Sequence, residues 1–259
     1  MEFQYENSFV VKEKIARKKV AILPIGAVEA HGPHLPLGTD NILAERISKM
    51  LAKRVDAFVL PTLPYGQVWS LRNFPGSINI TTESLISFLY DIGTSLHHQG
   101  FKIFAMVSAH LGNATAFKEA ARKLYDAVPD LKVLYMFYPG TNKTIEEVRE
   151  SPSSHHTFFH ACEMETSYML YLAPEFVNME KAINETPEIP PTVDVTPTPW
   201  EEFTDTAVLG HAKLATREKG EKVIQVALDE MARYISELKN TLELVLKFHM
   251  RATIKPSNP

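Results

Sequence analysis

The sequence predicts an α/β protein with a mostly parallel central sheet between two layers of helices. Over the first 138 residues, short apolar segments rich in β-branched residues alternate with longer segments whose apolar residues recur at helical spacing. Such alternation is typical of parallel sheets whose crossover helices cover both faces. Hydrophobic residues make up 45% of the chain and charged residues 22%, which is ordinary for a globular protein with a large core. We therefore expect a three-layer α/β/α fold and a single domain over residues 1–259.

Four segments have the character of buried strands, and a helical segment lies between each pair. The strands are expected at residues 20–27, 57–66, 101–108 and 131–138. The helices are expected at residues 40–55, 81–100 and 114–128. In the first helix Leu43, Ile47 and Leu51 are four residues apart on one face, and Thr39 or Asp40 can cap its N-terminus.

The pattern changes after residue 138. Residues 139–159 are polar, residues 160–173 have helical character, and residues 187–199 contain five prolines. We interpret the proline-rich segment as an extended arm at the rim of the site or at a subunit contact, and not as a domain boundary. One helix or two are expected between Ala215 and Met250, with this apolar stripe: Val223, Ala227, Met231, Ile235, Leu238, Leu242 and Val245.

The charge and cysteine content exclude several classes of protein. A net charge of −4 and a pI near 6.2 provide no broad basic surface for nucleic acid or an anionic membrane. The single cysteine, Cys162, cannot form an intrachain disulfide, and no apolar run reaches the roughly 18 residues of a spanning helix. No basic segment followed by an apolar one begins the chain, so we expect a cytoplasmic protein.

Chemically versatile side chains follow two of the predicted strands. Glu29 and His31 come after the first strand and project to the same side if the chain stays extended, and Asp40 returns after a stretch stiffened by prolines. His110 follows the third strand. Open α/β sheets bind ligands at the carboxyl ends of their strands, so these residues are expected to converge. Such nitrogen and oxygen ligands suit Zn²⁺, Mn²⁺ or Fe²⁺, and a carboxylate can bridge two ions.

A third polar segment, "HACEMETS", covers residues 160–167. On a regular helix His160 and Glu163 share a face, whereas Glu165 points elsewhere unless the helix begins irregularly. One carboxylate as a metal ligand and His160 as a proton shuttle would complete a hydrolase.

Other residues of the same types have simpler interpretations. His34 is expected to be structural, and His97–His98 lie at the end of a helix, where cationic side chains suit the dipole. His155–His156 are expected to be structural loop residues, with rim contacts to a substrate as the alternative. Cys162 is interpreted as a small buried residue and not as a nucleophile. No nucleophile elbow, Walker loop or dinucleotide fingerprint is present in the sequence.

The motifs "PIGAVEAHGPHLPLGTD", "SAHLGN" and "HACEMETS", together with the later "GHAKLATREKGE", resemble the creatininase (creatinine amidohydrolase) family in order and spacing. The resemblance covers residues from about 20 to 235. It implies a metal-dependent amidohydrolase with a three-layer fold, small-molecule substrates and one or two divalent ions per chain. It also implies a homo-oligomer, often a hexamer.

The resemblance further implies roles for individual residues. Four of them match the family's metal ligands, and these are Glu29, His31, Asp40 and His110, with Asp40 bridging two ions. His160 matches a catalytic histidine, and Glu163 and Glu165 match acidic residues of the active-site motif. In this scheme a metal-bound water attacks a cyclic amide or formamide carbon, and His160 passes the proton to the leaving nitrogen.

Two departures from the family pattern affect the second metal and the substrate. A carboxylate is expected two residues after His110, but this chain has Gly112. The second ion then needs another carboxylate, for which Glu165 is the first choice and Glu163 the second. Residues 67–71 also differ from the pattern, so creatinine is not the preferred substrate.

The leading hypothesis is therefore a metal-dependent hydrolase of a C–N bond in a small cyclic amide or formamide. The alternative is a non-catalytic small-molecule-binding member of the family with a degraded second metal site. A phosphoesterase would need basic residues near the site, and only Arg72 is close to the motifs in sequence.

Overall fold

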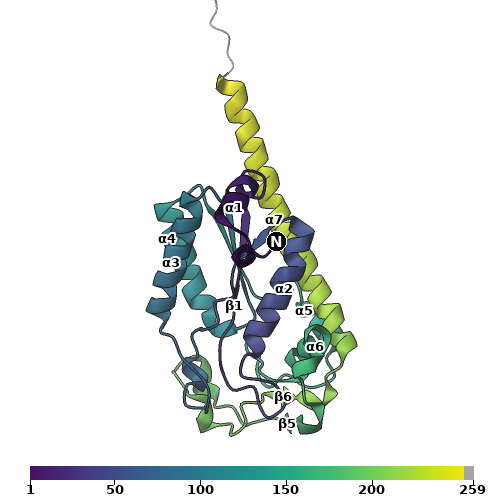
Figure 1. The fold of residues 1–259 in the computed structure, drawn as a ribbon. Helices are drawn as coiled ribbons and strands as arrows, with labels where there is room; N and C mark the ends of the chain where they lie inside the picture. The colour runs from purple at the N-terminus through teal and green to yellow at the C-terminus, as the bar shows by residue number, and fades with distance from the viewer. Residues whose placement is uncertain (254–259) are drawn as a thin grey trace, which may run out of the picture.

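The structure is a computed structural model that describes the backbone of residues 1–253 and the side chains of residues 1–244. Its centre is a four-stranded parallel sheet (Figure 1). The strands are β1 (Val20–Ile25), β2 (Phe58–Val59), β3 (Ile103–Ser108) and β4 (Lys132–Met136), in the order β2-β1-β3-β4. The chain direction is the same in all four strands, so their carboxyl ends lie at one edge of the sheet.

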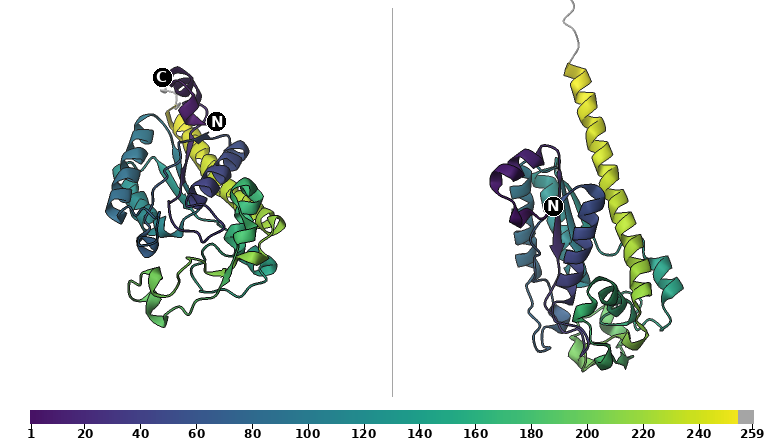
Figure 2. Two further views of the ribbon diagram at one scale, coloured as in Figure 1. Left: turned by 60° about the horizontal axis from the view of Figure 1, so that its bottom comes forward. Right: turned by 45° about the vertical axis from the view of Figure 1, so that its right-hand side comes forward.

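Helices cover both faces of the sheet (Figures 1 and 2). One face carries α2 (Thr39–Val55), α6 (Glu163–Leu172) and α7 (Arg217–Thr253), and the other carries α1 (Ser8–Ile15), α3 (Thr82–His98) and α4 (Ala114–Ala127). Strand β1 divides its residues between two separate cores, because successive side chains point to opposite faces: Val20 and Ile22 enter one core, and Ala21 and Leu23 the other. The predicted three-layer fold is confirmed.

The predicted boundaries differ from the observed ones at several elements. The ladder of the second strand contains only Phe58–Val59, and Leu63 adds a single bridge to Ile25. The predicted strand over 57–66 was too long because Pro61 and Pro64 have no N–H group to donate. The polar stretch 139–159 contains a short helix, α5 (Asn142–Val148), which was not predicted, and neither was α1.

The C-terminal helical region is one continuous helix, α7, which projects beyond the body of the protein (Figure 2). Its predicted apolar stripe is buried from Val223 to Ile235 and packs against α6 and α2. Val245, the last member of that stripe, lies outside the described side chains. A small antiparallel pair, β5 (Asn184–Glu185) and β6 (Gly210–His211), lies outside the central sheet.

Two side-chain amides join the loops that follow the strands. Asn113 donates from Nδ2 to the carbonyl oxygen of Gly26 at 3.0 Å and accepts from the N–H of Gln67 at 3.0 Å. Asn41 donates to the carbonyl oxygens of Ala27 at 2.9 Å and Pro64 at 3.1 Å. The loops after β1, β2 and β3 are thus held together at the edge of the sheet where the candidate ligands were expected.

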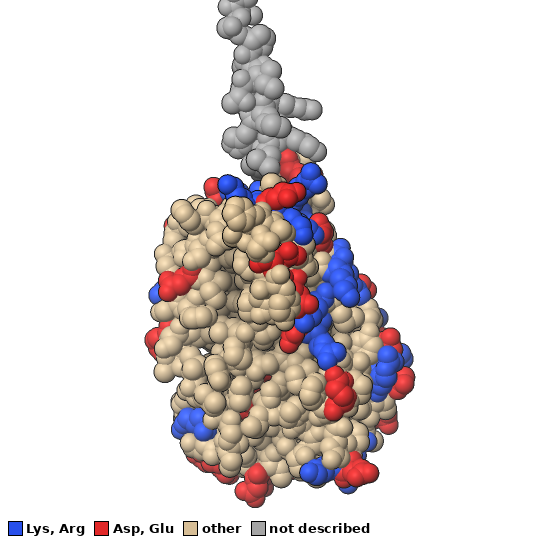
Figure 3. Space-filling model, viewed as in Figure 1, with Lys and Arg blue, Asp and Glu red and all other residues tan. Residues whose placement is uncertain are grey.

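On the face drawn in Figure 3, basic and acidic side chains are interspersed and form no broad patch of one sign. Among the described residues, no helix combines the length and the apolar character that crossing a membrane requires.

We expect the substitution Gly220→Ala to weaken the packing of α7 against α6. A Cβ atom at this position would lie 2.0 Å from the backbone oxygen of Ser167, so one of the two helices must shift. Overpacking of this kind costs about 1–3 kcal/mol. Urea unfolding should show the loss as a lower midpoint. Gly38→Ala is the matched control, since an added Cβ there meets nothing within 4 Å. Equal midpoints for the two variants would contradict the prediction.

Candidate active site

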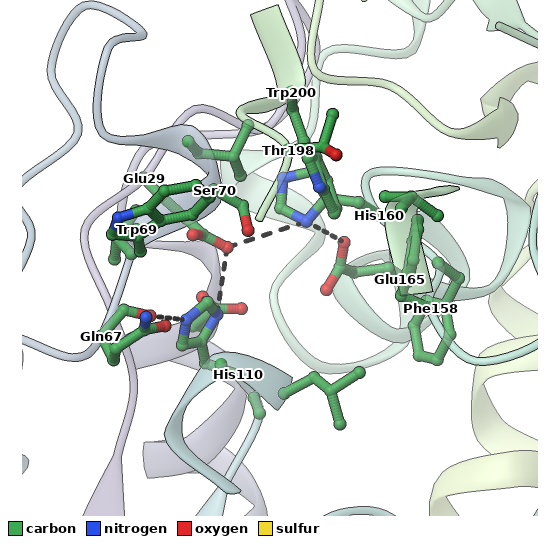
Figure 4. A pocket seen from close by; sticks show the side chains of 18 of the residues that line it. Glu29, Gln67, Trp69, Ser70, His110, Phe158, His160, Glu165, Thr198 and Trp200 are labelled. Atoms are coloured by element: carbon green, nitrogen blue, oxygen red, sulfur yellow. Dashed lines mark hydrogen bonds and ion pairs between the residues drawn. The ribbon is translucent and has the colours of Figure 1, made fainter. Parts of the chain in front are cut away.

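A cavity of about 510 Å³ opens at the carboxyl edge of the sheet. Its floor is formed by acidic and histidine side chains, and its walls are largely aromatic and aliphatic (Figure 4). The walls come from residues 67–71 after β2, from the loop before α6 and from the proline-rich segment. The predicted position of that segment at the rim of a site is therefore observed: Val193 and the residues 196–198 line the cavity.

The side chains at the floor form three overlapping groups with ligand-type geometry. The first consists of Glu29, Asp40 and His110, the second of His31, Asp40 and Glu165, and the third of Glu29, His31 and His160. Asp40 belongs to the first and the second. Its Oδ2 lies 3.2 Å from Nδ1 of His110, and its Oδ1 lies 3.5 Å from Nε2 of His31. One carboxylate thus has an oxygen in each of these two groups, as a bridging ligand requires.

Each histidine of the cluster is oriented by a backbone carbonyl oxygen. One ring nitrogen contacts that oxygen, and the other nitrogen faces the carboxylates, as Figure 4 shows for His110. In a neutral ring the first nitrogen carries the proton, so the second has its lone pair directed into the cluster. Metal-binding histidines in proteins are commonly fixed in this way. The contacts are His31 Nδ1 to the Glu29 oxygen at 3.1 Å, His110 Nε2 to the Gln67 oxygen at 2.6 Å, and His160 Nε2 to the Ala30 oxygen at 2.7 Å.

The electrostatics of the cluster fit divalent cations. Nε2 of His31 and Oδ2 of Asp40 are buried without a hydrogen-bond partner. Burial by itself lowers the pKa of His31, but the carboxylates of Asp40 and Glu165 outweigh it and raise that pKa well above its ordinary value. Burial likewise lowers the pKa of His110, and Glu29 and Asp40 reverse the effect. Negative charge that attracts protons so strongly also attracts metal ions.

Of the two glutamates in α6, only Glu165 reaches the cluster. Its Oε2 lies 3.6 Å from Nε2 of His31 and accepts a hydrogen bond of 2.6 Å from the N–H of Ala161. Ala161 has a positive φ of 46°, and the helix begins only at Glu163. The regular-helix expectation, in which Glu163 shares a face with His160, was wrong because the segment begins irregularly.

Glu163 lies outside the cavity and makes a separate ion pair. Its carboxylate accepts hydrogen bonds from Nζ of Lys219 at 2.6 Å and from the backbone N–H groups of Glu150 and Ser151. Burial alone raises the pKa of Glu163, but these hydrogen bonds outweigh it and hold the pKa below its ordinary value. The structure therefore does not bring Glu163 together with the other predicted site residues.

Comparison with known proteins shows the family of this chain. Residues 6–235 match the profile of the family described as "Creatininase: Creatinine amidohydrolase". The chain belongs to the creatininase family. It is 29% identical to the creatinine amidohydrolase of Pseudomonas putida over 231 residues, which cover 84% of this chain and 89% of that protein. It is 27% identical to the mycofactocin precursor peptide peptidase of Mycobacterium tuberculosis over 227 residues, covering 83% and 84%.

Solved creatininases have the same fold. One described as creatinine amidohydrolase (creatininase) superposes with a TM-score of 0.82 at 27% identity, covering 91% of this chain and 96% of its own. Another, a manganese form, gives a TM-score of 0.80 at 27% identity and covers 91% and 97%. The resemblance read from the motifs is thus confirmed as family membership.

In this creatininase-family member, position 112 has no room for a side chain. A Cβ atom on Gly112 would lie 2.4 Å from Nε2 of His110 and 2.5 Å from the carbonyl oxygen of Gln67. These two atoms form the hydrogen bond that orients His110. A side chain at this position would therefore displace His110 or Gln67 from the observed geometry. Glu165 is the carboxylate that groups with His31 and Asp40.

The remaining candidate residues have structural environments. His34 is buried, its Nε2 contacts the hydroxyl of Thr166 at 2.9 Å, and burial lowers its pKa to about 4. Cys162 is buried, and burial raises the pKa of its thiol to about 11, so the thiol stays protonated at neutral pH. The loop histidines His155 and His156 do not line the cavity, and both lie beside Asp194 of the proline-rich segment.

Sequence reasoning missed the groups that hold the site residues in place. The carbonyl oxygens of Ala30 and Gln67 have no sequence signal, because every residue carries the same backbone. Lys219, the partner of Glu163, lies within the motif "GHAKLATREKGE", but its role depends on a contact across 56 residues of sequence. Trp200, which packs edge-on against His160 with 5.4 Å between ring centroids, follows the proline-rich segment and was not singled out.

We expect Gly112→Ala to weaken metal binding in the first group. The added methyl group must displace either His110 or Gln67, and the loss of such an orienting hydrogen bond typically costs 10- to 100-fold in metal affinity. Metal retained after dialysis against a graded series of chelator concentrations measures the effect. Gly38→Ala serves again as the control. Unchanged retention in Gly112→Ala would show that the site tolerates a side chain at this position.

We expect Glu163→Gln to lower the free energy of unfolding near neutral pH but not in acid. The substitution removes one of the two carboxylates that pair with Lys219, the other being that of Glu150, and the loss should be about 1–3 kcal/mol at pH 7. The pKa of Glu163 is lowered on folding, so its contribution is fully present above the ordinary value of 4.5 and disappears as the pH falls through the folded-state pKa. Urea unfolding curves of the two proteins should therefore converge in acid. Glu13→Gln, on the exposed side of α1, is the control, and a constant difference at all pH values would contradict the prediction.

Proposed function

We propose that this protein is a metal-dependent amidohydrolase that cleaves a C–N bond of a small, uncharged cyclic amide or formamide. The observation that carries the proposal is the pair of ligand groups joined by Asp40 at the floor of the cavity. A zinc or manganese pair, or iron, fits this nitrogen and oxygen donor set. Glu29, Asp40 and His110 would hold one ion, and His31, Asp40 and Glu165 the other.

Atomic separations within the cluster support ion binding in preference to simple hydrogen bonding. Two ligands that share a tetrahedral zinc ion at about 2.0–2.2 Å are separated by roughly 3.3–3.6 Å. Charge-assisted hydrogen bonds are shorter, about 2.7–2.9 Å. The contacts of His31 with Asp40 and Glu165 are 3.5 Å and 3.6 Å, which match the first range. The contacts of His110 with Glu29 and Asp40, 3.1 Å and 3.2 Å, lie between the two ranges.

Divalent ions held here would lower the pKa of a water molecule and polarise the amide carbonyl. The protein must then move a proton from the attacking water to the leaving nitrogen, and His160 is placed for this task. Its Nε2–H is fixed on the carbonyl oxygen of Ala30, so its Nδ1 faces the cavity as a proton acceptor. Glu29 and Glu165 lie 3.7 Å and 3.9 Å from Nδ1 and would stabilise the imidazolium after proton uptake.

The walls of the cavity support an uncharged, flat substrate. They include Trp69, Phe158 and Trp200, and none of the described residues that line the cavity is a lysine or an arginine. Arg72, which directly follows the wall segment 67–71, stacks over the ring of Trp69 at 4.1 Å and donates to its carbonyl oxygen. A phosphate group on the substrate would therefore lack a cationic partner in this chain, which argues against the phosphoesterase hypothesis.

The alternative, a non-catalytic binder with a degraded second metal site, has no specific support. It was motivated by Gly112, but Glu165 completes the second group without a carboxylate at that position. The two hypotheses differ in turnover. Protein reconstituted with Zn²⁺, Mn²⁺ or Fe²⁺ should hydrolyse uncharged lactams or formamides faster than their phosphorylated analogues. Metal and ligand binding without turnover of any of these compounds would favour the binder.

We expect Asp40→Asn and His160→Ala to separate ligand and proton-transfer roles. Asp40→Asn should release both ions, because each group loses the shared carboxylate. His160→Ala should keep its metal and lose about 10²- to 10⁴-fold in kcat, as removal of a general acid–base does. Metal analysis of the purified variants and steady-state kinetics measure the two effects, with His98→Ala as the control. Full metal retention in Asp40→Asn would show that Asp40 is not a metal ligand. Metal loss in His160→Ala would show that His160 is one.

A further inference from the structure

We propose that a second, separate metal site lies at the mouth of the cavity, formed by His155, His156 and Asp194, and that Zn²⁺ binds there. The ligand atoms of these three side chains lie within 4.8 Å of one another. None of the three lines the catalytic cavity. The proposal is independent of the catalytic cluster and of its substrate.

The geometry of the three side chains is that of an open zinc site. Oδ2 of Asp194 lies 3.4 Å from Nε2 of His155 and 3.6 Å from Nε2 of His156. These separations are longer than charge-assisted hydrogen bonds and correspond to the edges of a zinc tetrahedron, roughly 3.3–3.6 Å. The side chain of His156 is 71% exposed and that of Asp194 42%, so water can reach the remaining coordination position.

The surroundings of His155 suit a metal ligand. Its side chain is only 9% exposed, and its ring stacks on Phe158 with 3.8 Å between centroids. Nδ1 accepts a hydrogen bond of 3.2 Å from the backbone N–H of Thr157 and lies 2.9 Å from the hydroxyl of that residue. These contacts and the stacking on Phe158 fix the ring with Nε2 directed toward Asp194.

The site would join two walls of the catalytic cavity. His155 and His156 belong to the loop that continues into Phe158 and His160, and Asp194 belongs to the proline-rich segment, whose Val193 lines the cavity. Phe158 packs on Trp200 at 5.3 Å, and Trp200 packs on His160 at 5.4 Å (Figure 4). An ion at the mouth would therefore hold the arm against the loop and restrict the movement of both walls.

The test compares zinc binding by the wild-type protein, His156→Ala and Asp194→Asn, with His98→Ala as a control that removes another exposed histidine. Each protein is dialysed at rising concentrations of free Zn²⁺, and the metal bound per chain is measured. We expect the wild type and the control to bind one ion more than either rim variant. Ions in the catalytic cluster are common to all four proteins and cancel in this difference.

A second measurement reports on the arm. Hydrogen exchange of residues 151–159 and 187–199 should slow on addition of Zn²⁺ in the wild type and in His98→Ala, but not in His156→Ala. Equal zinc binding by all four proteins, or slowing of exchange that persists in both rim variants, would overturn the proposal. Neither measurement depends on turnover. The proposal of a second metal site can therefore be wrong while the proposed catalytic function is right, and the proposed function can be wrong while the second site exists.

Discussion

The carboxylate of Asp40 is the group on which the rest of the site depends. It is almost fully buried, it lies in the first turn of α2 where the helix dipole favours negative charge, and its two oxygens face His31 and His110. Burial by itself raises the pKa of Asp40, but the two histidines outweigh it and hold that pKa far below its ordinary value. A permanent negative charge is therefore maintained where the loops after β1 and β3 meet, and the two ligand groups are built on either side of it.

The two glutamates of α6 show how closely spaced carboxylates acquire different roles. Glu165 enters the cluster, whereas Glu163, two residues earlier, is bound by Lys219 of α7 and by two backbone N–H groups. The first carboxylate supplies charge to a cavity, and the second connects the loop that carries His160 to the C-terminal helix. The irregular backbone at Ala161 permits this division, because it lets α6 begin after His160 and turns Glu165 inward.

Histidines and a carboxylate also meet near the surface, beside the loop that carries His160. The loop before α6 supplies both the aromatic wall at Phe158 and the exposed pair His155 and His156, and the proline-rich segment supplies the opposing wall and Asp194. Two segments without regular strands or long helices thus define access to the floor. Prolines restrict the backbone of the arm, which lowers the entropy lost when it is held in one position.

The sequence by itself determined the layered fold, the family and most of the cluster, because apolar periodicity is a local property and Glu29, His31, Asp40 and His110 lie next to predicted strand ends. Tertiary structure alone decided between Glu163 and Glu165, since one residue with positive φ sets which side chain turns inward. It also decided that a side chain at position 112 would meet His110 and Gln67. These outcomes rest on close approaches between segments far apart in the chain, which no local pattern encodes.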